Sequence, residues 1–136
     1  MALFQTLFSD PWQFIIWLLA FLLTLSVHES AHALVSYWLG DQTAHRAGRI
    51  TLNPLAHIDF LGFLALVTIG FGWGKPVPFN PYQLKYRRMG PVLVAGAGPV
   101  SNFLLAALAA LLLRGLFPSL GAGNVLTQFL FVVVLL

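Results

Sequence analysis

Two long apolar stretches dominate the chain, and each predicts a membrane-spanning helix. The first, residues 11–39, would form about 43 Å of helix at 1.5 Å per residue, which exceeds the roughly 30 Å hydrocarbon core of a bilayer. Asp10 followed by Pro11 is typical of a helix start, and Gly40 is typical of a helix end. The second stretch, residues 90–113, is also long enough to cross. The pattern therefore predicts an all-α membrane protein, a polytopic helical bundle.

Two shorter apolar stretches predict incomplete crossings. Residues 60–71 would form only about 18 Å of helix, so we expect a short re-entrant or shallow segment there. Residues 124–136 are also shorter than the roughly 20 residues that a span needs, so we expect a partial span and a fragment that ends within a helix. We treat residues 1–136 as a single intramembrane core that is incomplete at its C-terminus.

The polar region between the long stretches predicts a small β or extended element on the cytosolic side. Residues 48–54 have the pattern of a short strand ended by a turn. Residues 76–81 should be extended, because each proline restricts the residue before it. This extended segment is either a stiff linker or an edge that binds a peptide by strand addition, and the pattern leaves both open.

Composition supports a membrane protein and excludes several other classes. The chain is 59% hydrophobic and 8% charged, whereas soluble domains average about 25% charged residues. A net charge of +3 on scattered cations predicts no nucleic-acid partner. The absence of cysteine excludes disulfides and thiolate metal sites. Residues 1–10 carry no lysine or arginine, so we expect a permanent first span rather than a cleaved signal peptide.

The distribution of cations predicts the orientation. If residues 60–71 do not cross, six cations lie on one face and the uncharged N-terminal ten residues lie on the other. The positive-inside rule then places the N-terminus outside and residues 40–89 inside. These cations are Arg46, Arg49, Lys75, Lys85, Arg87 and Arg88.

The candidate chemistry lies in the first span, where Glu29, the only glutamate of the chain, stands between His28 and His32. Positions i and i+4 share one face of a helix, so both imidazoles can bind the same metal ion. A carboxylate beside the first histidine can then act as a base toward water at that ion. Ionisable groups at membrane depth are costly, which indicates that these three serve a function. The pattern predicts His28 and His32 as metal ligands and Glu29 as the catalytic residue.

Two histidines leave a catalytic zinc ion short of one ligand, since such sites usually take three protein ligands and a water. The remaining candidates are His45, His57, Asp41 and Asp59. For His57 and Asp59 we favour an indirect or structural role, with Asp59 as the N-cap of the following helix. Farther along, Asn102 can either hydrogen-bond between helices or stabilise an oxyanion.

Four blocks in this order resemble the site-2 protease family of intramembrane zinc metalloproteases, in its compact prokaryotic branch without a PDZ domain. They are HESAH, GDQTAHRAGRITLNPLAHID, FGWGKPVPFNP and AGPVSN, and they lie between about residues 20 and 110. The resemblance implies one zinc ion per chain on His28 and His32, with Glu29 as base. It implies hydrolysis of peptide bonds in or near the transmembrane segments of substrate proteins. It also implies a multi-pass location in lipid, in a prokaryotic cell membrane, and says nothing of the oligomeric state.

The chain departs from the family at the third ligand. Family members take it from an aspartate in a later LDG-type motif, which these residues do not contain. Two other functions remain open from the sequence. One is a membrane carrier of metal ions or protons that uses His28, Glu29 and His32 as a relay. The other is a packing subunit whose polar patch only joins helices.

Overall fold

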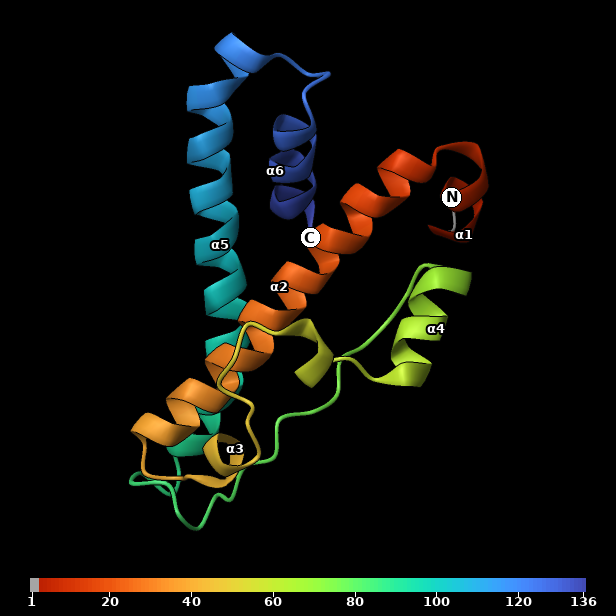
Figure 1. Cartoon of the computed structure of the whole chain (residues 1–136). Helices are drawn as coiled ribbons and strands as arrows, with labels where there is room; N and C mark the ends of the chain where they lie inside the picture. Colours follow the sequence, from red (N-terminus) through yellow and green to blue (C-terminus); the bar gives the residue numbers. More distant parts are fainter. Residues whose placement is uncertain (1–2) are drawn as a thin grey trace.

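Two long helices, α2 (Pro11–Trp38) and α5 (Gly90–Leu120), cross each other and organise the fold (Figure 1). The computed structural model describes residues 3–136. Short elements stand between and beside the long helices: α1 (Leu3–Ser9), α3 (Thr43–Arg46), the 3-10 helix η1 (Pro54–Ala56), α4 (Phe60–Ile69) and α6 (Val125–Leu135). The helical fold class predicted from the apolar pattern is confirmed.

The ends of α2 match their predicted signals. The side chain of Asp10 accepts a hydrogen bond from the backbone N–H of Gln13 at 3.0 Å, as an N-cap does. Pro11 occupies the first helical position, where its missing N–H costs nothing. The helix ends at the C-cap Leu39, and Gly40 follows with φ +103°, a conformation that glycine adopts without strain.

Helix α5 begins at Gly90 as predicted but continues past the expected end at residue 113 to Leu120. Arg114 and Pro118 lie inside it. The extension is explained by packing, because Leu113 and Leu116 lie against a buried apolar cluster that α6 completes. Members of this cluster come from α2, α5 and α6: Ile16, Ala20, Ala109, Leu130, Val132 and Val133. The predicted partial span thus forms α6 and packs on both long helices.

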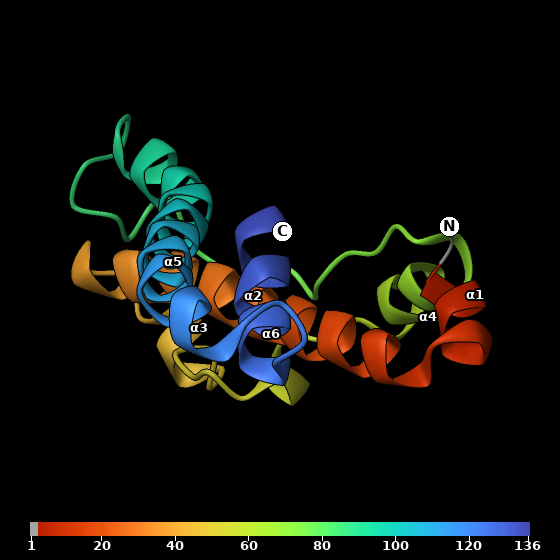
Figure 2. The ribbon, with the colours of Figure 1, turned by 90° about the horizontal axis from the view of Figure 1, so that it is seen from above.

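The chain turns back on itself around α4, and the re-entrant placement of this segment in a membrane stays a prediction. After α4, Gly70 adopts φ +80° and reverses the chain. Ile58 and Gly74 then form an antiparallel bridge, and the N–H of Lys75 donates to the carbonyl of His57 at 2.7 Å. The two ends of the segment are therefore neighbours. In both views α4 lies beside α1 (Figures 1 and 2).

The strand predicted at residues 48–54 is wrong. Gly48 adopts φ +67°, and the following residues form bends and turns that lead into η1. The carbonyl of Thr51 accepts hydrogen bonds from the side chains of Ser30 and His57 instead of pairing with a neighbouring strand. Within residues 3–136 the bridge between Ile58 and Gly74 is the β pairing that forms, so the β element is reduced to that contact.

A buried carboxylate, Asp41, joins the end of α2 to the segment before α5. It accepts hydrogen bonds from the hydroxyl of Ser36 at 3.0 Å, from the N–H of Thr43 at 2.9 Å and from the N–H of Asn80 at 2.6 Å. Burial raises the pKa of Asp41, but these hydrogen bonds stabilise the charged form more and hold the pKa below its usual value. The connection fixes residues 40–80 against the helix that carries the histidines.

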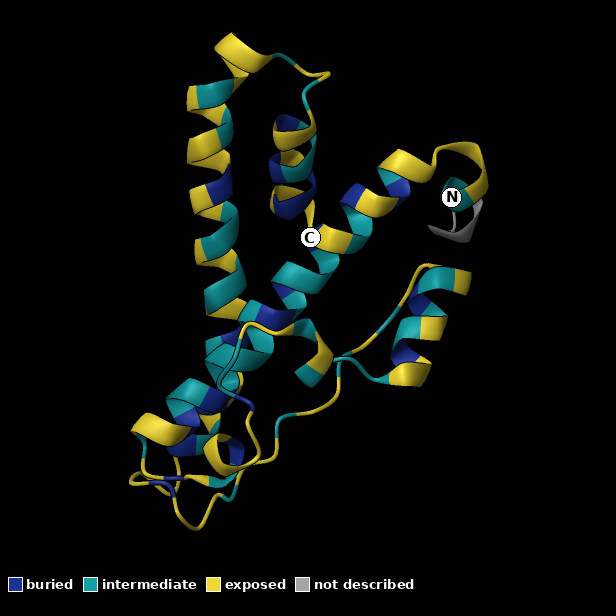
Figure 3. Cartoon of the chain, viewed as in Figure 1, coloured by how far each residue is buried: buried dark blue, intermediate teal, exposed yellow. Residues whose placement is uncertain are grey.

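Both long helices expose much apolar surface (Figure 3). On α5 the exposed fractions reach 75% for Phe103, 63% for Leu104 and 68% for Leu111. Contiguous apolar surface of this kind is unfavourable in water and favourable in lipid. Among the described helices, α2 and α5 are long and apolar enough to cross a membrane.

Candidate metal centre

His28 and His32 lie one turn apart on α2. Helix α2 crosses and packs against α5 (Figure 1). Their ring centroids are 4.7 Å apart, and the ring planes stand at 80° to each other. Both side chains are half-buried. The spacing therefore brings the two rings side by side, as the sequence predicts for two ligands of one metal ion.

Both rings turn their Nε2 atoms toward the same point on α5. That point lies at Gly98, where an added Cβ atom would overlap Nε2 of His28 and Nε2 of His32. Gly98 is buried, and its missing side chain leaves the space that the two nitrogen atoms face. Two imidazole nitrogens that converge on one point form half of a tetrahedral zinc site.

A hydrogen bond to α5 indicates which nitrogen of the His32 ring carries the hydrogen. Its Nδ1 lies 2.6 Å from the carbonyl oxygen of Val94. Because a carbonyl can only accept, Nδ1 must donate, which leaves the lone pair of the neutral ring on Nε2. Histidines that bind metal ions commonly donate their other ring N–H to a carbonyl in this way. The donor set and its orientation thus fit zinc.

The four residues considered as third ligands have other partners. Asp41 is saturated by hydrogen bonds, and Asp59 accepts from the N–H of Gly62 at 2.8 Å as the N-cap of α4, as predicted. His45 stacks on Tyr37 with ring centroids 4.8 Å apart. Across residues 3–136, no three His, Asp or Glu side chains form a group that could hold a metal ion by themselves.

His57, the fourth of these residues, is fully buried beside α2. Its Nε2 lies 2.7 Å from the carbonyl oxygen of Thr51 and therefore donates to it. Its Nδ1 is buried without a partner in the described chain. This packing places His57 next to Ser30, the neighbour of Glu29. The indirect role favoured for His57 remains a prediction.

Glu29 lines two cavities, of which one also includes His32 and the other His28. One, of about 360 Å³, is lined by Glu29, His32, Gly74 and the extended segment after it. The other, of about 280 Å³, is lined by Glu29, His28, Gly74 and Asn102. A Cβ added to Gly74 would lie 3.4 Å from the Oε1 of Glu29, so the backbone of the re-entrant segment passes close to this carboxylate.

Arg49 connects the chain before α4 with the chain after it, near Glu29. Only 5% of its surface is exposed, and its guanidinium donates to the carbonyl of Ala56 at 2.7 Å and to those of Lys75 and Pro76. Burial lowers the pKa of Arg49, and the nearby carboxylate of Glu29 opposes that change. The arginine thus supports the wall of the cavity that contains Glu29, His32 and Pro76.

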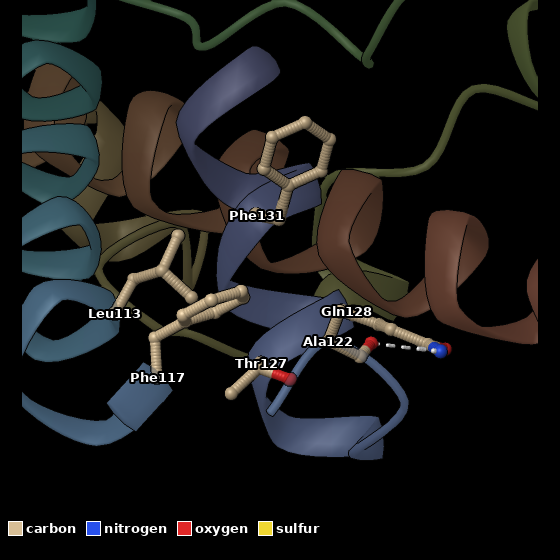
Figure 4. Close-up of a pocket in the computed structure, with 6 residues that line it drawn as sticks. All are labelled: Leu113, Phe117, Ala122, Thr127, Gln128 and Phe131. Atoms are coloured by element: carbon tan, nitrogen blue, oxygen red, sulfur yellow. Dashed lines mark hydrogen bonds between the residues drawn. The ribbon is translucent and has the colours of Figure 1, made fainter. Parts of the chain in front are cut away.

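A further cavity, of about 260 Å³, lies between α5 and α6 and is unrelated to the histidines (Figure 4). Its lining is mainly apolar, with Leu113, Phe117 and Phe131. Its polar members are committed, since the hydroxyl of Thr127 donates to Gly121 and the amide of Gln128 donates to Ala122. Its lining contains no side chain that could bind a metal ion or transfer a proton, so we assign the site to the cavities around Glu29.

Three residues of this site were not singled out as site residues by the sequence pattern. Gly98 and Val94 belong to a run of small and apolar residues that only predicts close helix packing. Arg49 was counted as a topology signal. A glycine or arginine becomes informative only when its distant partner is known, and here the partners of Gly98 and Val94 lie on another helix.

Two curated bacterial relatives are similar to this chain. "Putative zinc metalloprotease YwhC" of Bacillus subtilis is 47% identical over 85 residues, which is 62% of this chain. "Putative zinc metalloprotease Rip2" of Mycolicibacterium smegmatis is 33% identical over 102 residues, which is 70% of this chain. No protein-family model and no solved structure matches. These relatives confirm the resemblance to the site-2 protease family over the aligned residues.

The chain spans 39% and 38% of the length of these two relatives. The activity, substrates and partners of the whole protein are therefore proposals.

Proposed function

We propose that this chain belongs to the site-2 protease family and forms the zinc-binding core of an intramembrane metalloendopeptidase. The observation that carries the proposal is the convergence of Nε2 of His28 and Nε2 of His32 on one point at Gly98, beside Glu29. The full-length protein would be a multi-pass protein of a prokaryotic cell membrane with one zinc ion per chain. Its substrates would be proteins cut in or near a transmembrane segment.

The ligand set of the proposed site combines His28 and His32 with one acidic residue of the full-length protein. Catalytic zinc usually takes three protein ligands and keeps one open position. The aspartate of the LDG-type motif, which these 136 residues do not contain, would complete the set. Zinc held there would supply Lewis-acid polarisation and would lower the pKa of water toward about 7.

The side chain of Glu29 would carry the proton through the reaction. As the water oxygen bonds to the scissile carbonyl carbon, a carboxylate oxygen of Glu29 would take the water proton. When the C–N bond breaks, Glu29 would give this proton to the leaving nitrogen, which departs as an amine. The two cavities that Glu29 lines support this role, because both leave space for water and peptide beside its carboxylate.

The extended segment after Gly74 supports binding of an unwound peptide. Pro76, Val77 and Phe79 line the cavity that contains Glu29 and His32. The main-chain groups of Val77 have no hydrogen bond within residues 3–136. A peptide carbonyl inside a helix is already hydrogen-bonded, so a transmembrane substrate must unwind locally before it can react. Unpaired main-chain groups beside Glu29 would stabilise that unwound stretch by strand addition.

The function can be tested with the full-length protein in proteoliposomes that contain a labelled transmembrane peptide. We expect peptide cleavage that a chelator removes and added zinc restores, with no zinc flux across the bilayer. Measurement of cleavage products and of lumenal zinc in the same vesicles separates the alternatives. Zinc flux without cleavage would instead identify a carrier, and a zinc content near zero in the intact protein would identify a packing subunit.

A further inference from the structure

Asn102 places an uncommitted amide in the cavity that contains His28 and Glu29. The cavity has a volume of about 280 Å³, and Asn102 enters it from α5. The Oδ1 of Asn102 is buried and has no hydrogen-bond partner in the described chain. A buried acceptor without a partner is unfavourable, so such a group usually has one in the working state.

The position of Asn102 relative to the histidines follows from the helix. Asn102 is four residues after Gly98, so the two residues lie on one face of α5, one turn apart. Gly98 is the point that both Nε2 atoms face. Ser101 stands between them, but its hydroxyl donates to the carbonyl of Gly98 at 2.7 Å and it lines a different cavity. Asn102 is therefore the polar side chain of α5 that lines the cavity with His28 and Glu29.

The other polar side chain that borders this cavity from α2, Thr24, is already committed. Its hydroxyl bonds to the carbonyls of Ala20 and Phe21, both at 3.0 Å. His28 and Glu29 have assigned roles as ligand and base. The remaining lining residues have no polar side chain: Phe21, Leu25, Gly74 and Leu136, the last residue of the given sequence. Asn102 is thus the lining polar side chain without an assigned role or partner within residues 3–136.

The chemistry of the amide indicates what it binds. An asparagine side chain presents one acceptor and one donor group, in the same arrangement as a peptide unit. It can therefore accept from the N–H and donate to the C=O of an extended main chain. A transmembrane substrate that unwinds loses these hydrogen bonds inside its own helix and needs replacements in lipid.

We propose that Asn102 binds the main chain of the substrate by pairing its side-chain amide with one peptide unit beside the scissile bond. This inference rests on the proposed protease function and names a residue that recognises the unwound substrate. Asn102 binds by main-chain groups and so recognises substrate conformation rather than side-chain identity. It neither holds zinc nor transfers a proton.

The test is a double-mutant cycle between the protein and the substrate, with the full-length protein in proteoliposomes. The protein variants are Asn102→Leu and Asn102→Ala, and Ser101→Ala is the control because Ser101 lines a different cavity. The substrates are one transmembrane peptide and a series in which each amide flanking the scissile bond is replaced singly by an ester. An ester lacks the N–H donor, so it removes the same contact from the other side.

We expect either substitution of Asn102 to lower kcat/KM by about tenfold, mainly through KM, with zinc content unchanged. One ester position should lower kcat/KM for the wild-type protein similarly and cause no further loss in the Asn102 variants. Independent losses at every ester position, or unchanged kinetics, would overturn the inference. Loss of zinc from the folded variants would also overturn it, because Asn102 would then support the metal site. If the wild-type protein fails to cleave the amide peptide, the protease function itself fails.

Discussion

In the full-length protein, Glu29→Gln is expected to lower the rate of peptide cleavage by about a thousandfold while the zinc content stays at the wild-type level. Glutamine has the size of glutamate but cannot take a proton from water. The two atoms assigned to zinc are Nε2 of His28 and Nε2 of His32, so the substitution leaves them intact. Single-turnover cleavage and zinc analysis on the same sample would measure both results.

A matched control for Glu29→Gln is Asp59→Asn, which also converts a carboxylate into an amide. Asp59 caps α4 through the N–H of Gly62, and asparagine caps helices equally well. Cleavage by this control should stay close to wild type. Undiminished turnover by Glu29→Gln would show that the carboxylate of Glu29 is not the base.

Gly98→Ala is expected to weaken zinc binding by about a hundredfold and to abolish cleavage at limiting zinc. The added Cβ would overlap Nε2 of both imidazoles, so either the rings must turn or α2 and α5 must separate, and each change displaces the two nitrogen atoms. Disturbance of groups that orient metal ligands typically costs about ten- to a hundredfold in affinity, and here both ligands are displaced. Competition with a chromogenic chelator would measure the zinc affinity.

Gly96→Ala provides the control on the same helix. A Cβ added to Gly96 meets nothing within 4 Å, and alanine has the better helix propensity. Gly96→Ala should bind zinc like the wild type and be at least as stable. Equal zinc affinity in Gly98→Ala and Gly96→Ala would contradict the convergence of the two rings at Gly98.

The long helices were predictable because their signals are local. A continuous apolar run, an aspartate before a proline and a glycine after the run place α2 within one residue of its predicted bounds. The end of α5 was missed because it depends on tertiary contacts. Leu116 packs on the buried cluster, and the helix continues beyond the predicted end at residue 113 to Leu120.

The predicted strand at residues 48–54 failed for a related reason. Alternating apolar and polar residues predict a strand only if a partner strand is available. Here the side chains of Ser30 and His57 bind the carbonyl of Thr51, and Gly48 turns the chain away. Competition between side-chain and main-chain hydrogen bonding was decided by the packing against α2.

The candidate site divides in the same way between local and distant contributions. The spacing of His28, Glu29 and His32 on one helix is visible in the sequence. The contacts that orient them are not, because Val94 and Gly98 come from α5, more than sixty residues later. Spacing along a helix predicts which residues share a face. Where a second helix leaves space for a metal ion on that face depends on how the two helices pack.

The central claim, that one zinc ion is held by Nε2 of His28 and Nε2 of His32, is tested most directly by zinc K-edge X-ray absorption on the full-length protein. We predict nitrogen neighbours at about 2.0–2.1 Å with the outer-shell pattern of two imidazoles. This pattern should disappear in the double variant His28→Ala, His32→Ala. A spectrum with the same imidazole pattern in the wild type and in the double variant would contradict the account.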